Sequence, residues 1–182
     1  MRNILMVLSG PSGVGKGTIA KILRKNGVAL SVSCTTRNPR EGEINGKEYF
    51  FISKAEFEEK IKNGGFLEYS EHFGNYYGTP KDFVEEKLKT DDVLLEIDVN
   101  GGLNVKKNFN GAVLIMITSS KEEIERRLIK RHTETDEEIK RRMERIDYEL
   151  SKSSFYDYVV ENDDLERALN EIKEIINKEK SK

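Results

Sequence analysis

The sequence predicts an α/β fold in which helices cover both faces of a parallel β-sheet core. A glycine-rich loop follows the apolar segment 4–8 and precedes a helical pattern, the order of a strand, loop and helix unit. Strand-like and helix-like segments then alternate along the chain, as in folds with a parallel sheet. The strand-like segments are continuous apolar runs, which is typical of strands buried on both faces.

The core elements follow from these patterns in chain order. Apolar runs predict strands over 4–8, 93–97, 112–118 and 158–161. Helices are expected over 18–25, after a cap at Ser119 or Ser120, and over 165–177 after a cap at Asp163 or Asp164. Because each strand leads into a helical pattern, the helices are expected to cover both faces of the sheet.

Residues 31–79 differ from this core and are expected to form an inserted mixed subdomain. They are rich in Tyr, Phe and Gly, and Ser53 with Glu56 predicts a capping box for a helix over 54–63. Thr79 is expected as the N-cap of the next helix, with Pro80 at its first position. The prediction is a single domain, 1–182, with a core (1–30, 80–122 and 152–182), the insert (31–79) and a helical lid of about 123–151.

The lid is expected to be a charged helical hairpin with little apolar face. Thr135 and Glu138 predict a capping box for its second helix. Residues 121–145 hold nine Lys or Arg and eight Asp or Glu, so they form no polybasic stripe for a nucleic acid. Arginines that close over the phosphates during phosphoryl transfer explain these basic residues better than binding of a nucleic acid does. Arg126 and Lys140 are interpreted as charges on the helix surface.

Composition narrows the class of protein. The 31 basic and 33 acidic residues leave a formal net charge of −2, so no overall field favours a polyanion. Cys34 is the only cysteine, which excludes an intrachain disulfide and is consistent with a reducing compartment. No apolar run reaches the length of a signal-peptide core or a membrane span. We therefore expect a cytoplasmic protein with neither a nucleic acid nor a membrane as partner.

The glycine-rich loop carries the strongest functional signal. It reads Gly10, Pro11, Ser12, Gly13, Val14, Gly15, Lys16, Gly17 and Thr18. Glycines let backbone N–H groups turn toward an anion at a helix N-terminus, and Lys16 adds a positive charge, so a nucleotide phosphate is the expected ligand. The alternative is a turn that only joins a strand to a helix. Gly17 stands where a hydroxyl residue usually contacts Mg²⁺, so the metal is expected to be held mainly through phosphate oxygens and water.

A second phosphate site is indicated in the insert. Arg37 and Arg40 lie beside Pro39, and guanidinium groups present paired donors that suit a phosphate. Two solvated surface arginines are the alternative. Tyr49 and the segment 75–79 add hydroxyl groups nearby in sequence, although core packing is an equally simple role for each tyrosine.

Carboxylates in the same region suggest guanine as the base. The guanine edge offers two donors, N1–H and the exocyclic amine, which Glu68 and Asp98 could accept. Adenine lacks this pair and would leave carboxylate oxygens unpaired, at a cost of about 1 to 3 kcal/mol. Glu96 and Asp98 lie where a parallel strand ends, the edge at which ligands bind. A structural cap by either residue is the competing explanation.

Several motifs together resemble one family from end to end. The segments 10–16, 33–40, 74–79, 95–101 and 161–165 occur in the order and spacing of the guanylate kinase family. The resemblance implies a P-loop kinase fold and Mg²⁺-dependent transfer of the γ-phosphoryl group of ATP to GMP, and to dGMP, giving ADP and GDP. It also implies a place in purine nucleotide metabolism and GMP recycling, and it leaves monomer and homodimer open.

The resemblance assigns site residues position by position. It implies that residues 10–18 and Asn162 bind ATP, that Lys16, Arg37, Arg131 and Arg142 are catalytic, and that the last two bridge donor and acceptor from the lid. It implies a GMP site made of Ser33, Arg37, Arg40, Tyr49, Glu68, Tyr77, Thr79 and Asp98. Mg²⁺ would be held by ATP phosphates and water, and Glu96 or Asp98 would contact the metal through that water.

This chain departs from the resemblance at Gly17, which replaces a hydroxyl residue, and at Glu96, where Asp is frequent. Both departures concern the metal and leave the reaction class unchanged. Two other functions remain open at this point: a guanylate-kinase-like module that binds protein partners without catalysis, and a nucleoside monophosphate kinase that prefers another base such as adenine.

Overall fold

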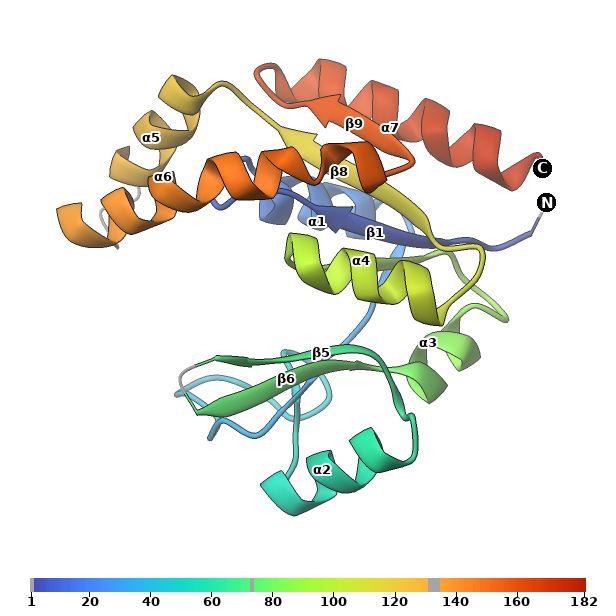
Figure 1. The fold of residues 1–182 in the computed structure, drawn as a ribbon. Helices are drawn as coiled ribbons and strands as arrows, with labels where there is room; N and C mark the ends of the chain where they lie inside the picture. Colours follow the sequence, from blue (N-terminus) through green and yellow to red (C-terminus); the bar gives the residue numbers. More distant parts are fainter. Residues whose placement is uncertain (1, 73, 131–134) are drawn as a thin grey trace.

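A parallel five-stranded sheet forms the centre of the computed structural model, which describes residues 2–72, 74–130 and 135–182 (Figure 1). The strand order is β2-β7-β1-β8-β9, and every neighbouring pair is parallel. The strands are β1 (Leu5–Ser9), β2 (Ala29–Leu30), β7 (Val93–Glu96), β8 (Val113–Thr118) and β9 (Tyr158–Glu161). The predicted α/β class is confirmed, and β2 is a short edge strand that the sequence patterns did not reveal.

Helices cover both faces of this sheet because its strands are apolar on both sides. In β1, Met6 and Leu8 pack into one core cluster, and Leu5 and Val7 pack into the other. The first cluster lies under α1 (Lys16–Lys25) and α7 (Leu165–Lys180). The second lies under α3 (Lys81–Lys87) and α4 (Val99–Asn108). The continuous apolar runs of the sequence are therefore explained by burial of both faces.

A smaller mixed sheet lies beside α3 and α4, below the core in Figure 1. Its order is β4-β3-β6-β5, and its strands are β3 (Cys34–Thr35), β4 (Phe50–Phe51), β5 (Phe66–His72) and β6 (Asn75–Pro80). Helix α2 (Lys54–Lys62) packs on it through Phe57, whose ring stacks on Phe66 with centroids 4.3 Å apart. The predicted capping box of Ser53 and Glu56 is confirmed.

The predicted cap of the following helix is wrong. Pro80 is extended, with φ −68° and ψ 127°, and it precedes α3 as its N-cap without a side-chain hydrogen bond. Thr79 is fully buried in β6, and its hydroxyl donates to Glu68 Oε1 at 2.6 Å. A hydroxyl committed to a neighbouring strand is not available to the helix N-terminus, so the tertiary contact overrides the local capping signal.

Two antiparallel helices, α5 (Lys121–Lys130) and α6 (Asp136–Ser151), follow β8, and a short 3₁₀ turn (Ser153–Phe155) leads to β9. The capping box of Thr135 and Glu138 is confirmed. The expectation of little apolar face is wrong, because Ile124, Leu128 and Ile146 are fully buried in the core cluster that contains α1. No helix in the described ranges is both long and apolar enough to cross a membrane.

The parallel topology brings the ends of distant strands to one edge. The phosphate loop follows β1, Asp98 comes shortly after β7, and Asn162 comes directly after β9. Ligands of open α/β sheets bind at this carboxyl edge because the connecting loops and helix N-termini converge there. The candidate site is therefore sought at this edge.

Candidate active site

The phosphate loop adopts a backbone that only glycine accommodates at two of its positions. Gly10 has φ 139°, and a Cβ there would lie 2.1 Å from the carbonyl oxygen of Ile117. Gly15 is the N-cap of α1 with φ 96°, and a Cβ there would lie 2.5 Å from Asn162 Nδ2. These close approaches let the loop run directly over the sheet edge, with its backbone N–H groups at the start of α1.

The start of α1 is suited to an anion. It has no side-chain cap and no acidic residue in its first turn, so no carboxylate of the helix competes for its N–H groups. Lys16 lies at this position and donates to the carbonyl oxygens of Gly10 and Pro11 at 2.6 and 2.9 Å. The loop thereby holds an ammonium group beside its own N–H groups, as phosphate binding requires.

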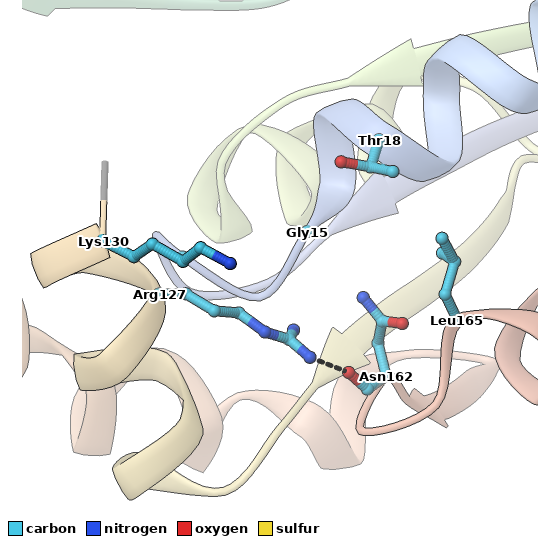
Figure 2. Close-up of a pocket in the computed structure, with 7 residues that line it drawn as sticks. Gly15, Thr18, Arg127, Lys130, Asn162 and Leu165 are labelled. Atoms are coloured by element: carbon cyan, nitrogen blue, oxygen red, sulfur yellow. Dashed lines mark hydrogen bonds between the residues drawn. The ribbon is translucent and has the colours of Figure 1, made fainter. Parts of the chain in front are cut away.

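A cavity of about 280 Å³ opens on the other side of this loop (Figure 2). Its lining residues are Gly13, Gly15, Thr18, Arg127, Lys130, Asn162 and Leu165. Asn162 is 4% exposed, and its amide nitrogen donates to the carbonyl oxygen of Val14 at 2.7 Å. Its Oδ1 has no hydrogen-bond partner among the described residues, so a buried acceptor remains to be satisfied there.

Arg127 ties the lid to this cavity, and the sequence analysis did not single it out. Its guanidinium donates to the carbonyl oxygens of Asn162 at 2.7 Å and Val14 at 3.2 Å, and to Glu123 Oε1 at 2.6 Å. Figure 2 shows the bond to Asn162. The spacing of Glu123 and Arg127, one helical turn apart, was the available signal, but it does not reveal the distant carbonyls.

The lid arginines chosen from the sequence have different outcomes. Arg142 of α6 reaches the phosphate loop, where it donates to the hydroxyl of Ser12. Arg131 lies outside the described residues. The lid therefore contacts the loop through Arg127 and Arg142 in the part of the chain that the structure describes.

Arg37 is held by a carboxylate in the insert. Its guanidinium donates to Glu43 Oε1 at 2.9 Å and to the carbonyl oxygen of Asn38 at 2.7 Å. Glu43 Oε2 accepts the backbone N–H of Arg40 at 2.7 Å, while the Arg40 side chain is exposed. These hydrogen bonds lower the pKa of Glu43. Glu43 thus orients Arg37, and the sequence analysis did not single it out. Its place three residues after Arg40 was the available signal.

Two tyrosine rings lie next to Arg37. The rings of Tyr49 and Tyr77 have centroids 6.0 Å apart, and the Arg37 guanidinium carbon lies 5.6 Å from the Tyr49 centroid. Burial raises the pKa of Tyr49, which therefore remains a protonated donor at neutral pH. Tyr49, Ser33, Thr79 and Glu96 also line one cavity of about 160 Å³ between the insert and the core. The structure thus brings together several residues that were predicted to bind GMP.

Glu68 forms a buried carboxylate at the junction of insert and core. It is 7% exposed, and burial raises its pKa against the opposing hydrogen bond from Thr79. The negative charge of Asp98 raises this pKa further. Both carboxylates flank Gly101, where a Cβ would lie 3.2 Å from Glu68 Oε2 and 3.4 Å from Asp98 Oδ1. A ligand that donates hydrogen bonds would relieve this buried charge.

Asp98 also has the capping role considered as its alternative. Its Oδ1 accepts the N–H of Gly101 at 2.8 Å as the N-cap of α4. Its Oδ2 lies 3.9 Å from His72 Nε2 across the junction. One oxygen is thus committed to the helix, and the other faces the insert.

Two further carboxylates lie near Lys16. Glu96 is the last residue of β7, and its side chain is partly open to solvent. The surrounding protein atoms desolvate its carboxylate and raise its pKa, whereas the positive charge of Lys16 lowers this pKa. Burial also raises the pKa of Glu149 on α6, which Lys16 and Arg145 lower. No group of three or more acidic, His or Cys residues within the described ranges could hold a metal by itself.

The fold and the loop define an α/β P-loop nucleotide kinase. The family model described as guanylate kinase matches residues 2–179. The guanylate kinase of Clostridium tetani is 51% identical, covering 98% of this chain and 88% of that protein. The guanylate kinase of Bacillus subtilis is 46% identical, covering 96% and 88%.

A solved structure agrees with these sequence relatives. The crystal structure of guanylate kinase from Anaplasma phagocytophilum has a TM-score of 0.76 and 35% identity, and covers 100% of this chain and 88% of that one. The chain belongs to the guanylate kinase family.

Proposed function

We propose that this chain transfers the γ-phosphoryl group of ATP to GMP, and also to dGMP, giving ADP and the nucleoside diphosphate. Phosphorylation of GMP follows from the family, and this makes the chain an enzyme of purine nucleotide metabolism and GMP recycling. The observation that carries the proposal is the junction of Glu68, Thr79 and Asp98, which faces the same sheet edge as the phosphate loop. A base-selective acceptor site and a phosphate site at one edge are what transfer between two nucleotides requires.

The donor nucleotide is assigned to the phosphate loop. Residues 10–18 would hold the phosphates through backbone N–H groups, with Lys16 neutralising charge on the transferred group. The adenine would occupy the cavity beside Asn162, whose unpaired Oδ1 suits the exocyclic amine of adenine. Arg127 would keep this cavity connected to the lid through the Asn162 carbonyl.

The acceptor nucleotide is assigned to the insert, 31–79. Arg37, Arg40, Tyr49, Tyr77 and Ser33 would bind the GMP phosphate, since they supply cationic and hydroxyl donors. Glu68, Thr79 and Asp98 would recognise guanine. The desolvated Glu68 carboxylate rejects adenine because adenine leaves its oxygens unpaired.

Alignment and charge neutralisation are the main tasks of the remaining groups. Arg142 donates to the hydroxyl of Ser12 in the phosphate loop, and this contact supports its assignment as a lid cation that would lie beside the donor phosphates. We assign Arg131 the same task. A lid of about 123–151 that closes over the core would exclude water, which otherwise would hydrolyse ATP.

Mg²⁺ is the proposed cofactor, and the residues present fit it. Glu96 and Asp98 supply carboxylate oxygens, the donor type that Mg²⁺ prefers, at the edge where the phosphates would lie. When bound, the metal would neutralise charge on the phosphates of ATP. Its ligands would be ATP phosphates and water, and Glu96 or Asp98 would accept hydrogen bonds from that water.

We further propose that the partners are the small molecules ATP and GMP, without a nucleic acid or a membrane. The balanced charge of 31 basic and 33 acidic residues supports this, because a formal net charge of −2 gives no overall attraction for a polyanion. Its place would be the cytoplasm, where the nucleotide pools lie, as a monomer or homodimer.

The direct test is an ADP-release assay with Mg²⁺ and ATP that compares GMP, dGMP and AMP as acceptors. We expect kcat/KM for GMP to exceed that for AMP by at least about 10²-fold, because a buried carboxylate rejects an unpaired base edge. A well-folded protein that does not phosphorylate GMP would contradict the activity. Equal kcat/KM values for GMP and AMP would contradict the proposed guanine site but not the kinase activity.

Changing Glu43 to Gln is expected to raise the KM for GMP about 3- to 10-fold. Arg37 loses the partner that orients its guanidinium, while its charge remains. Glu41→Gln, in the same loop but exposed, serves as the matched control.

A second measurement separates positioning of Arg37 from a general effect on the loop. Inhibition by guanosine, which has no phosphate, should be unchanged in Glu43→Gln. In an Arg37→Gln background, Glu43→Gln should have no further effect on the KM for GMP. Equal effects in both backgrounds would show that Glu43 does not act through Arg37.

Lowering the pH is expected to raise the KM for GMP at pH values above the ordinary glutamate pKa of 4.5, because the pKa of Glu68 is raised. Protonation removes the acceptor for guanine, so binding is lost as the pH falls through the raised pKa. A raised pKa also means that protonation at Glu68 stabilises the fold, so unfolding at this residue does not explain the loss. KM values for GMP and ATP between neutral pH and about pH 5 check this, and a flat profile for GMP contradicts it.

A further inference from the structure

The cavity of about 160 Å³ between the insert and the core touches both ends of the proposed acceptor site. Tyr49, assigned to the GMP phosphate, and Thr79, assigned to guanine, both line it. In a nucleotide the ribose joins the base to the phosphate. A cavity shared by a residue of the phosphate end and a residue of the base end therefore lies beside the ribose of a bound acceptor.

Ser31, which lies between β2 and β3, places an unpaired hydroxyl in this cavity. Its Oγ is buried and has no hydrogen-bond partner among the residues that the structure describes. The N–H of Ser31 donates to the carbonyl oxygen of Leu94 in β7 at 2.9 Å, and the carbonyl oxygen of Ser33 accepts the N–H of Phe50 at 2.9 Å. The backbone around Ser31 is thus fixed by both sheets, while its hydroxyl remains to be satisfied.

Other polar side chains of the cavity are already engaged or lie toward the donor site. The Thr79 hydroxyl donates to Glu68 at 2.6 Å, and Glu48 accepts a backbone N–H in its own loop at 2.8 Å. Glu96 lies on the side of the phosphate loop, where a Cβ on Gly17 would lie 3.4 Å from its Oε1. Among the lining side chains not assigned to the GMP phosphate, this leaves the unpaired serine hydroxyl to meet the sugar.

We propose that Ser31 recognises a ribose hydroxyl of the acceptor nucleotide. A serine hydroxyl and a ribose hydroxyl are each a donor and an acceptor, so one hydrogen bond between them satisfies both groups. An acceptor without that ribose hydroxyl leaves Ser31 unpaired and binds more weakly. This inference rests on the proposed binding of GMP by the insert and adds recognition of the sugar to it.

The test compares GMP, dGMP and 3′-deoxy-GMP as acceptors for the wild type and Ser31→Ala at saturating ATP. Ser31→Ala is expected to raise the KM for GMP about 3- to 10-fold, the usual effect of one neutral hydrogen bond, with kcat retained. The KM for one of the two deoxy analogues should be unchanged by the substitution. That analogue identifies the ribose hydroxyl that Ser31 contacts.

Thermal unfolding without nucleotide separates this role from a structural one. The free Ser31→Ala protein should have an unfolding midpoint no lower than that of the wild type, because the Ser31 hydroxyl bonds no described protein group. A structural serine would instead lower the midpoint and weaken all three acceptors alike. Equal effects of Ser31→Ala on the three acceptors, or no effect on any of them, overturn the proposal.

Two serine variants serve as matched controls. Ser70→Ala removes a partly buried hydroxyl from β5 outside this cavity, so its KM values should match those of the wild type. Ser33→Ala removes a hydroxyl assigned to the GMP phosphate, so it should raise the KM for all three acceptors by the same factor.

The failure of this inference and the failure of the proposed function give different results. A wild-type protein that does not phosphorylate GMP would refute the function. A wild-type protein that phosphorylates GMP, with a Ser31→Ala variant that responds equally to all three acceptors, would refute only the ribose contact.

Discussion

Replacement of Lys16 with methionine is expected to lower kcat about 10²- to 10³-fold, the usual cost of losing one group that stabilises transition-state charge. Methionine keeps the length and flexibility of the side chain and removes only the ammonium. The contacts of Lys16 to Gly10 and Pro11 lie within the loop itself, so the core clusters are untouched. Thermal unfolding should therefore remain close to that of the wild type.

The measurement is kcat at saturating ATP and GMP, together with the unfolding midpoint. Lys21→Met is the matched control, because Lys21 lies on the same helix with its side chain exposed. Near-wild-type turnover of Lys16→Met would remove the ammonium from the mechanism. Loss of folding in that variant would mean that the lysine has a structural role.

Replacement of Glu68 with glutamine is expected to lower the preference for GMP over AMP, expressed as a ratio of kcat/KM values, about 10- to 100-fold. The amide retains one acceptor but replaces the other with a donor, which opposes a donor of guanine. Because Glu68 is a buried carboxylate with a raised pKa, its removal should not destabilise the fold.

Glu71→Gln is the control for this second prediction, since Glu71 lies on the same strand and is exposed. The part of the acidic rise in the KM for GMP that Glu68 causes should also disappear in Glu68→Gln, because glutamine does not titrate. An unchanged base preference would move guanine recognition elsewhere and leave the kinase activity intact.

Local signals in the sequence were sufficient for several elements. The capping boxes of Ser53 and Thr135 form as predicted, since each involves a residue only three positions away. The cap at Thr79 failed because its hydroxyl bonds Glu68 on the neighbouring strand. The lid was also misjudged, because its few buried aliphatic residues were outnumbered by surface charges.

The site residues show the same difference between local signals and tertiary contacts. The phosphate loop was predictable because its glycines and lysine are contiguous and act through the local backbone. Glu43 and Arg127 were missed, since a charged residue in a polar segment is usually a solvated one. Their roles depend on what they touch: Glu43 holds Arg37, and Arg127 reaches the carbonyl of Asn162.

The sequence by itself determined the parallel α/β class and the phosphate loop at the end of the first strand, because apolar runs and glycine spacing encode local structure. Only the tertiary structure decided which distant groups meet at the sheet edge. Gly17 and Glu96 became neighbours because β1 and β7 are parallel partners whose ends coincide. Such adjacency arises from strand order, and strand order is not a property of any single segment of the chain.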